Sequence, residues 1–148
     1  MRKVVDWDTY FMDMAVTAAT RSKDPSTQVG AVIINPHKHP VSSGYNGFAP
    51  GAEETEEAWE RPAKYARVIH AEMNSIAHAA AEGVSTRGAT MYVTLFPCGH
   101  CAKVIAAAGI VRLVAKELGH SGWDDAHKEA AQIFQDAGVE SVLLTGVL

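Results

Sequence analysis

The chain has 148 residues, of which 47% are hydrophobic, and these values predict a single domain spanning residues 1–148 with a buried core. Its net charge of -4 argues against a nucleic-acid partner, because such proteins carry a basic surface. No apolar run reaches the roughly 20 residues of a membrane helix, and the first residues lack the apolar core of a signal peptide. Two cysteines spaced as metal ligands suit a reducing compartment, so we expect a cytoplasmic protein (in the host cytoplasm if its source is viral).

The first expected element is a helix that Asp6 caps and that runs to about residue 20, because its apolar side chains recur at helical spacing. A polar turn follows, with Arg21, Ser22 and Lys23, before an apolar strand at residues 29–34. Two cations and a hydroxyl at such a turn can hold a phosphate. The alternative is a solvated turn that only joins the two elements.

A second strand is expected at residues 41–45, after a turn in which His37 and His39 read as exposed residues and not as a metal site. Asn46 follows this strand, and its amide either hydrogen-bonds a sugar hydroxyl or closes an ordinary turn. Residues 48–64 form a long acidic connection that we expect to be solvated and partly helical. A long loop beside a site can also act as a lid.

The residues with the clearest chemistry lie between positions 70 and 101. A helix is expected from His70 to residue 81, and a strand at residues 89–95 leads to Pro97 and Cys98. The chain has two cysteines, Cys98 and Cys101, and Cys98 lies 28 positions after His70. Together with Glu72, these residues match the His-x-Glu and Pro-Cys-x-x-Cys signature of zinc-dependent deaminases.

The chemistry explains why these residue types are needed together. One imidazole and two thiolates give zinc three ligands, and its fourth tetrahedral position stays open for water. Zinc lowers the pKa of that water towards about 7, and a carboxylate outside the metal shell, here Glu72, can move its proton. Helices that begin at His70 and Cys98 would aim free N–H groups at the site and favour the thiolate of Cys98.

A cysteine pair of this spacing is also compatible with a redox pair or with a closed structural zinc site. A redox pair would not need His70 and Glu72 upstream, and a closed structural zinc site would need a fourth protein ligand. His100 lies inside the Cys-x-x-Cys loop and is the candidate for that ligand, but the intervening residues of such loops usually point away from the metal. The open, catalytic arrangement is therefore favoured.

The remaining chain is expected to form a helix at residues 98–108 and a strand at 110–116. After a loop at 118–123, a helix at 123–137 and a strand at 139–144 follow. The last three strands are each separated by a helix, which favours parallel pairing with right-handed crossovers. The sequence thus predicts an α/β protein, a three-layer α/β/α sandwich around a five-stranded mixed sheet. The zinc would lie between the amino ends of the second and third helices, near the strand end at residue 95.

Four segments resemble the cytidine deaminase superfamily and, within it, the deoxycytidylate (dCMP) deaminases, and the resemblance covers nearly the whole chain. The zinc motifs are common to the superfamily, whereas the segments before and after the first two strands are typical of the nucleotide-specific branch. The segments are residues 21–31, 44–47, 70–74 and 95–103.

This resemblance implies a cytidine deaminase-like fold and zinc-dependent hydrolysis of dCMP to dUMP and ammonia, which feeds thymidylate synthesis. It implies zinc ligation by His70, Cys98 and Cys101, with Glu72 as the proton shuttle. It also implies that substrate is held by the backbone N–H of Ala71 at the pyrimidine carbonyl, by Asn46 at the sugar and by the phosphate turn. That turn consists of Arg21, Ser22 and Lys23.

The resemblance further implies a homo-oligomer, with a hexamer favoured, that is activated by dCTP and inhibited by dTTP, with Mg2+ on the effector triphosphate. The effector candidates are Asn46, Gly47, Phe48, Asn74 and His78. The chain has no spare cysteine for the structural zinc of some viral relatives. Two alternatives stay open: a deaminase of another cytosine compound such as dCTP, deoxycytidine or a base in RNA, and a zinc-stabilised nucleotide sensor without activity. Glu72 argues against the sensor.

Overall fold

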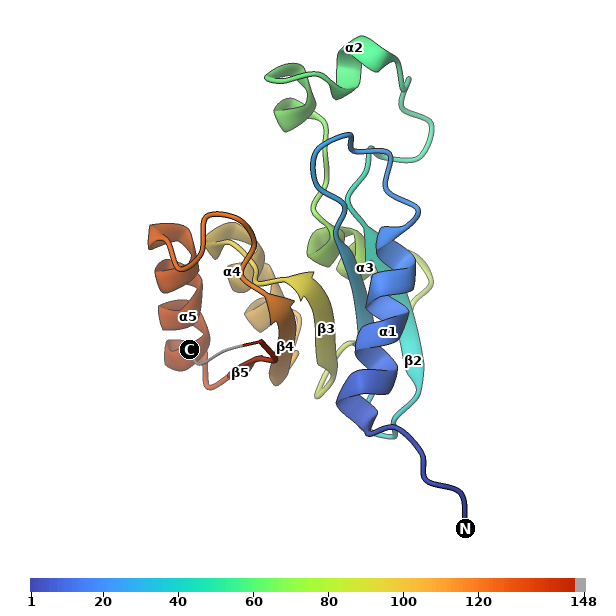
Figure 1. The fold of residues 1–148 in the computed structure, drawn as a ribbon, viewed down its shortest axis with the longest axis vertical. Helices are drawn as coiled ribbons and strands as arrows, with labels where there is room; N and C mark the ends of the chain where they lie inside the picture. Colours follow the sequence, from blue (N-terminus) through green and yellow to red (C-terminus); the bar gives the residue numbers. More distant parts are fainter. Residues whose placement is uncertain (146–148) are drawn as a thin grey trace.

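The structure is a computed structural model that describes residues 1–145. Its centre is a five-stranded sheet with the strand order β2-β1-β3-β4-β5 (Figure 1). The strands are β1 (Gly30–Ile34), β2 (Pro40–Tyr45), β3 (Thr90–Leu95), β4 (Arg112–Glu117) and β5 (Glu140–Leu143). The helices are α1 (Trp7–Ala19), α2 (Glu56–Trp59), η1 (Ala63–Ala66), α3 (Ala71–Ala81), α4 (Gly99–Ala107) and α5 (Asp125–Ala137).

The strand directions confirm the predicted mixed sheet. β1 runs antiparallel to both of its neighbours, β2 and β3. The β3–β4 and β4–β5 pairs are parallel, as expected for strands joined through helices.

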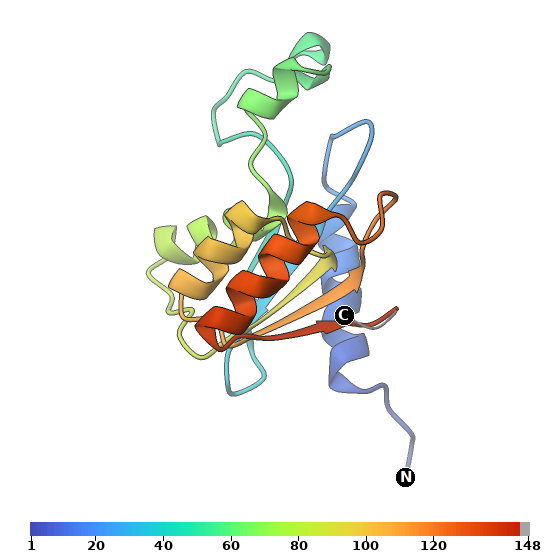
Figure 2. The ribbon, with the colours of Figure 1, turned by 90° about the vertical axis from the view of Figure 1, so that its left-hand side faces the viewer.

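Helices cover both faces of the sheet, which confirms the three-layer α/β/α sandwich. α1 lies on one face, and α3, α4 and α5 lie on the other (Figures 1 and 2). Alternate residues of one strand supply the two cores, because successive side chains of a strand point to opposite faces. On β1, Val32 and Ile34 pack with Phe11 of α1, whereas Ile33 belongs to the core under the three other helices.

Capping side chains set the helix ends; they confirm one prediction and correct another. The Asp6 carboxylate accepts the backbone N–H of Thr9 at 2.9 Å, so Asp6 caps the first helix as predicted, and the helix begins at Trp7. The Asp124 carboxylate accepts the N–H of His127 at 3.0 Å, so the last helix begins at Asp125 and not at residue 123.

Two glycines let helices approach the sheet very closely. A Cβ at Gly30 would lie 1.9 Å from the Ala15 carbonyl oxygen of α1. A Cβ at Gly44 would lie 2.6 Å from the Ser75 nitrogen and 2.7 Å from the Ala71 oxygen, both in α3. Any side chain at Gly44 would therefore push α3 away from β2, together with the site residues at its amino end.

The connection between β2 and α3 projects from the body as an arm, defined here as residues 48–68 (Figures 1 and 2). It contains α2 and η1, which confirms the predicted partial helicity. The expectation of a solvated connection is wrong for three of its side chains. Phe48 and Trp59 are buried and stack at 4.2 Å between ring centroids, and Lys64 is only 4% exposed. Among residues 1–145, no helix is long and apolar enough to cross a membrane.

The amino end of α1 is fixed to the sheet by the carboxylate of Asp8. Arg112 of β4 donates to both of its oxygens, at 2.9 and 3.0 Å, and the Tyr92 hydroxyl donates at 2.7 Å. Hydrogen bonding from Arg112 is the main reason why the pKa of Asp8 lies below its ordinary value. A two-point guanidinium–carboxylate contact of this kind also fixes orientation.

We predict that Asp8→Asn lowers the free energy of unfolding by about 1–2 kcal/mol at pH 7, since it weakens a charge-assisted hydrogen bond. Because the folded-state pKa is depressed, the stabilisation is complete above the unfolded pKa of about 3.9 and disappears as pH falls through the folded value. Urea unfolding at pH 7 and below pH 4 measures both effects. Asp13→Asn, an exposed residue of the same helix, is the control. An equal loss at both pH values would contradict the prediction.

Candidate zinc site and substrate cavity

The three predicted zinc ligands meet where two helices begin. His70 is the N-cap residue of α3, Cys98 is the N-cap residue of α4, and Cys101 lies in the first turn of α4. His70 Nδ1 lies 3.3 Å from Cys101 Sγ and 3.8 Å from Cys98 Sγ. All three ligand atoms lie within 4.8 Å of one another, and within the described part of the chain no other residues form such a group.

These separations fit a zinc ion. Tetrahedral zinc with Zn–S and Zn–N bonds of about 2.3 and 2.0–2.1 Å needs ligand atoms roughly 3.5–3.8 Å apart. Cys101 is buried, Cys98 is partly buried and His70 is exposed, so the group is open on one side. His100 is exposed and does not belong to the group, which supports the predicted open site with three protein ligands over a closed one with four.

Without a cation the three ligands share protons unequally. Hydrogen bonds from Cys101 and then from His70 lower the pKa of Cys98 to about 3, so Cys98 is a thiolate. The contact with Cys98, together with burial, raises the pKa of Cys101, and the contact with Cys98 also raises the pKa of His70. A cation bound here would displace the remaining protons, so metal affinity must rise with pH over the range in which they dissociate.

Glu72 lies in the first turn of α3 and is only 5% exposed. Burial raises the pKa of its carboxyl group, although nearby His70 acts in the opposite direction. A carboxyl group with a raised pKa can both accept and return a proton near neutral pH, which a shuttle requires.

A cavity of about 1220 Å³ opens beside the candidate zinc ligands. Its volume is slightly above the range of about 300–1,000 Å³ typical of small-molecule sites. Residues from the amino end of α3, the carboxyl ends of β3 and β4 and the arm line it together. His70, Glu72 and Cys98 all belong to its wall, so a bound molecule can reach the ligands and the buried carboxyl group at once.

The structure separates the predicted substrate residues into two sets. Asn46 and Ala71 line the cavity, whereas Arg21, Ser22 and Lys23 are not among its lining residues. Ser22 Oγ donates to the Asn46 carbonyl at 2.8 Å, and Lys23 pairs with an arm carboxylate. The Asn46 side chain holds local backbone: its oxygen accepts from Val29 N at 2.8 Å, and its nitrogen donates to the Thr27 carbonyl at 2.9 Å.

The predicted effector residues do not form one group. Asn74 and His78 share a face of α3, as their spacing predicts, and both contact β2: Asn74 Nδ2 donates to the Tyr45 carbonyl at 2.9 Å, and His78 Nδ1 lies 2.8 Å from the Ser43 carbonyl. Gly47 forms an antiparallel backbone bridge with Ile69 at the base of the arm.

Of the other two effector candidates, Phe48 lines a second cavity of about 440 Å³ within the arm. Asn46 lines the large cavity instead.

Several cavity residues carry no sequence motif, and motif reasoning missed them. They come from the arm, from the carboxyl end of β4 and the loop after it, and from the first turn of α5; they include Arg61, Lys64, Tyr65, Lys116, His120 and His127. A sequence signal was present only for the arm residues, through the expectation that a long loop beside a site can act as a lid. The other residues reach the cavity only because the carboxyl end of β4 and the amino end of α5 lie close to the end of β3 in the folded chain.

Comparison with known proteins agrees with this geometry. The deoxycytidylate deaminases of Homo sapiens and Pongo abelii are each 40% identical to the chain over 141 residues, which cover 91% of this chain and 78% of each relative. The structure of the dCMP deaminase from cyanophage S-TIM5 in complex with dCMP and dUMP has the same fold, with a TM-score of 0.77 at 23% identity, covering 96% of this chain and 99% of that one.

A family model described as the cytidine and deoxycytidylate deaminase zinc-binding region matches residues 5–117. That range includes the three ligands and Glu72. The chain therefore belongs to the family of cytidine and deoxycytidylate deaminases.

Proposed function

We propose that the protein is an enzyme that hydrolyses dCMP to dUMP and ammonia. The observation that carries the proposal is the position of His70, Cys98 and Glu72 on the wall of one open cavity, with Cys101 directly behind them. Family membership and the names of the two primate relatives support the choice of a cytosine nucleotide as substrate.

Zinc held by His70, Cys98 and Cys101 would supply a water molecule with a pKa of about 7 as the attacking group. Glu72 takes one proton from this water and passes it to the ring nitrogen N3 of cytosine as the water oxygen adds to C4. Glu72 then takes the second proton, from the hydroxyl group now on C4, and passes it to the amine, so that the C4–N bond breaks, ammonia leaves and the carbonyl of dUMP forms. Ala71 is the first residue of α3, so its backbone N–H has no partner within the helix and can donate to the pyrimidine carbonyl. Burial keeps Glu72 away from bulk water, which preserves the proton for the substrate.

For the nucleotide, the proposal keeps Asn46 at the sugar and the turn of Arg21, Ser22 and Lys23 near the phosphate. The turn directly precedes Asp24 and Ser26, which line the cavity, so a modest change in the turn would bring its cations to the rim. Arg61 of the arm already lies on the wall and adds positive charge there.

The proposal includes regulation. We infer a homohexamer of the cytoplasm, activated by dCTP and inhibited by dTTP, each with Mg2+ on its triphosphate. Asn46, Gly47, Phe48, Asn74 and His78 remain the effector candidates, although they do not form one group. Asn74 and His78 join α3 to β2, and Gly47 lies at the base of the arm. A ligand that contacts Asn74 or His78 would act on α3, whose amino end carries His70 and Glu72.

The first prediction concerns Glu72. Glu72→Gln is expected to keep the fold and the zinc but to lose about 10²–10⁴ in kcat for dCMP, because the substituted amide cannot move the proton. Steady-state ammonia release and metal analysis on the same sample measure both. Glu82→Gln, at the exposed carboxyl end of the same helix, is the control and should stay active. Activity within a few fold of the unchanged protein would exclude the proton-shuttle role.

The second prediction concerns His70. His70→Ala is expected to lose zinc, because an open site has only three protein ligands. Metal content after dialysis against a weak chelator separates this effect from that of Glu72→Gln, which should keep one zinc per chain. His100→Ala, in the same loop as the cysteines but exposed, should also keep it. Full metal retention in His70→Ala would remove this residue from the ligand set.

The third prediction concerns the substrate. Turnover of dCMP should exceed that of deoxycytidine, cytidine and dCTP, and it should rise with dCTP plus Mg2+ and fall with dTTP plus Mg2+. Ammonia release with each compound tests the substrate, and sedimentation measures the oligomer. Turnover of another cytosine compound in preference to dCMP would contradict the nucleotide assignment. Binding of nucleotides without any turnover would favour a sensor.

A further inference from the structure

The arm has few attachments to the rest of the molecule. At its base, Gly47 and Ile69 exchange two backbone hydrogen bonds of 3.1 and 2.8 Å. Farther out, two ion pairs join it to the loop of residues 22–28: Lys23 with Glu54 at 2.8 Å, and Asp24 with Lys64 at 3.0 Å. Two adjacent loop residues of opposite charge are thus each paired with an arm residue of the complementary charge.

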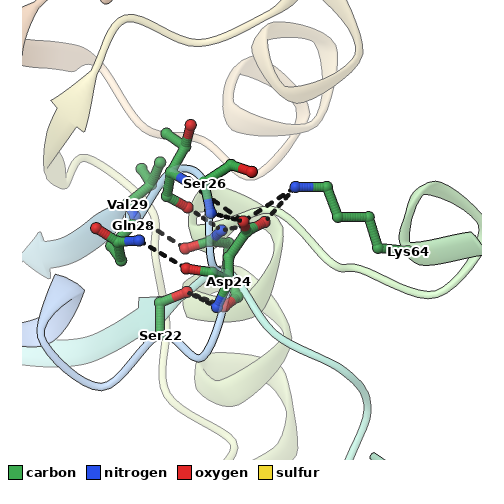
Figure 3. A network of polar contacts seen from close by, with 8 residues as sticks. Ser22, Asp24, Ser26, Gln28, Val29 and Lys64 are labelled. Atoms are coloured by element: carbon green, nitrogen blue, oxygen red, sulfur yellow. Dashed lines mark hydrogen bonds and ion pairs between the residues drawn. The ribbon is translucent and has the colours of Figure 1, made fainter. Parts of the chain in front are cut away.

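The two ion pairs differ in burial. The Lys23 side chain is 64% exposed, so its pair with Glu54 contributes little to holding the arm. The Asp24 and Lys64 side chains are 6% and 5% exposed, and Lys64 Nζ contacts both carboxylate oxygens, at 3.0 and 3.1 Å (Figure 3). The arm is therefore held to the loop chiefly by the Asp24–Lys64 pair.

Further hydrogen bonds stabilise the Asp24 carboxylate on the loop side. Ser26 N and Thr27 N donate to Asp24 Oδ1 at 2.8 and 3.2 Å, as Figure 3 shows for Ser26. Burial acts to raise the pKa of Asp24, but these bonds and the one from Lys64 outweigh it, and the pKa lies below its ordinary value. The carboxylate is thus charged, and it is held by the backbone of its own loop as well as by the arm.

The arm itself is an internally packed unit. Phe48 and Trp59 stack with an angle of 11° between their rings, and both side chains are buried. A unit of this kind, joined at its base by one backbone bridge, can change its angle to the body without unfolding. The Asp24–Lys64 pair then decides that angle, because a buried ion pair forms only in one well-defined geometry.

The angle of the arm matters for the cavity. Arg61 and Tyr65, three residues before and one residue after Lys64, line the cavity although both are exposed. Asp24 and Lys64 also lie on its wall, but no hydrogen bond joins either of them to His70, Glu72 or Cys98 within the described residues. A loss of the pair would therefore change the part of the wall that the arm supplies and leave the zinc end in place.

We propose that Asp24 and Lys64 are positioning residues that fix the arm so that Arg61 and Tyr65 face the cavity and help to capture the nucleotide. The identity of the nucleotide in this inference rests on the proposed function, whereas the ion pair itself is observed in the structure. It assigns the pair to substrate capture, measured by KM, and not to the chemical step, measured by kcat. It also gives a use for two charges whose burial contributes little to stability on its own.

The test uses the double variant Asp24→Asn/Lys64→Met in the full-length protein. Asparagine keeps an oxygen for the N–H groups of Ser26 and Thr27, and methionine keeps most of the lysine stem, so no unpaired charge is left buried. Glu57→Gln, an exposed arm residue without an ion pair among the described residues, is the matched control. Hydrogen exchange of residues 55–68 without any nucleotide reports on the arm independently of activity.

The double variant is expected to keep its zinc and its kcat and to raise KM for dCMP by about tenfold, because binding must then order the arm as well. Exchange should increase in residues 55–68 and remain unchanged in α3 and α4. The control should match the original protein in every readout.

Three results would overturn the proposal: unchanged exchange together with unchanged KM, a loss confined to kcat, or loss of zinc and fold in the double variant. If the original protein does not act on dCMP, the proposed function fails on its own. The exchange experiment then still decides whether the pair holds the arm, and KM is measured with the cytosine compound that is turned over.

Discussion

The site depends on one constraint: the amino ends of α3 and α4 must meet, because the ligands are divided between them. His70 caps one helix and Cys98 the other, so a shift of either helix by about 1 Å would exceed the tolerance of a metal–ligand bond. Gly44 maintains this geometry by allowing the Ala71 carbonyl region of α3 to contact β2 without an intervening side chain. The parallel pairing of β3 with β4 fixes the other helix, since β3 leads directly into Cys98. The geometry of the sheet therefore determines whether the three ligand atoms can meet around a metal ion.

Helix N-termini also explain why the site can hold several groups with opposed requirements. A thiolate and a buried carboxyl group are costly to place together in an apolar setting, since each desolvated charge raises the free energy. The free N–H groups and the positive dipole ends of two helices partly compensate for this cost. Hydrogen bonds from Cys101 and His70 lower the pKa of Cys98 to about 3, whereas burial raises the pKa of Glu72. One local geometry thus gives a ligand that is always deprotonated and a carboxyl group that can exchange its proton.

The sequence predicted the sheet, its mixed pairing and the ligand group well, because these depend on short-range patterns. Apolar runs fix the strands, and the spacing from His70 to Cys101 fixes the site. The residues that the sequence could not place are those whose role depends on distant partners. Lys64 lies in a stretch rich in acidic residues that reads as solvated, and its burial follows only from Asp24, 40 positions earlier. The turn of Arg21, Ser22 and Lys23 also has distant partners that the sequence does not reveal: the Ser22 hydroxyl donates to the Asn46 carbonyl, and Lys23 pairs with Glu54 of the arm.

The loop that follows this turn also joins residues that lie far apart in the sequence. Asp24 accepts from the backbone of its own loop and from the arm, and Asn46 links that loop to the end of β2 through Val29 and Thr27. The polar residues of this network line the cavity, yet much of their hydrogen-bonding capacity is already used within the protein. Asp24 and Lys64 would serve a substrate indirectly, by holding neighbouring groups in a fixed position, because pre-ordered contacts lower the entropic cost of binding. In this family member, the polar residues around the cavity therefore divide into those that contact a ligand and those that shape the wall. Which hydrogen-bonding groups are already occupied is visible only in the folded chain.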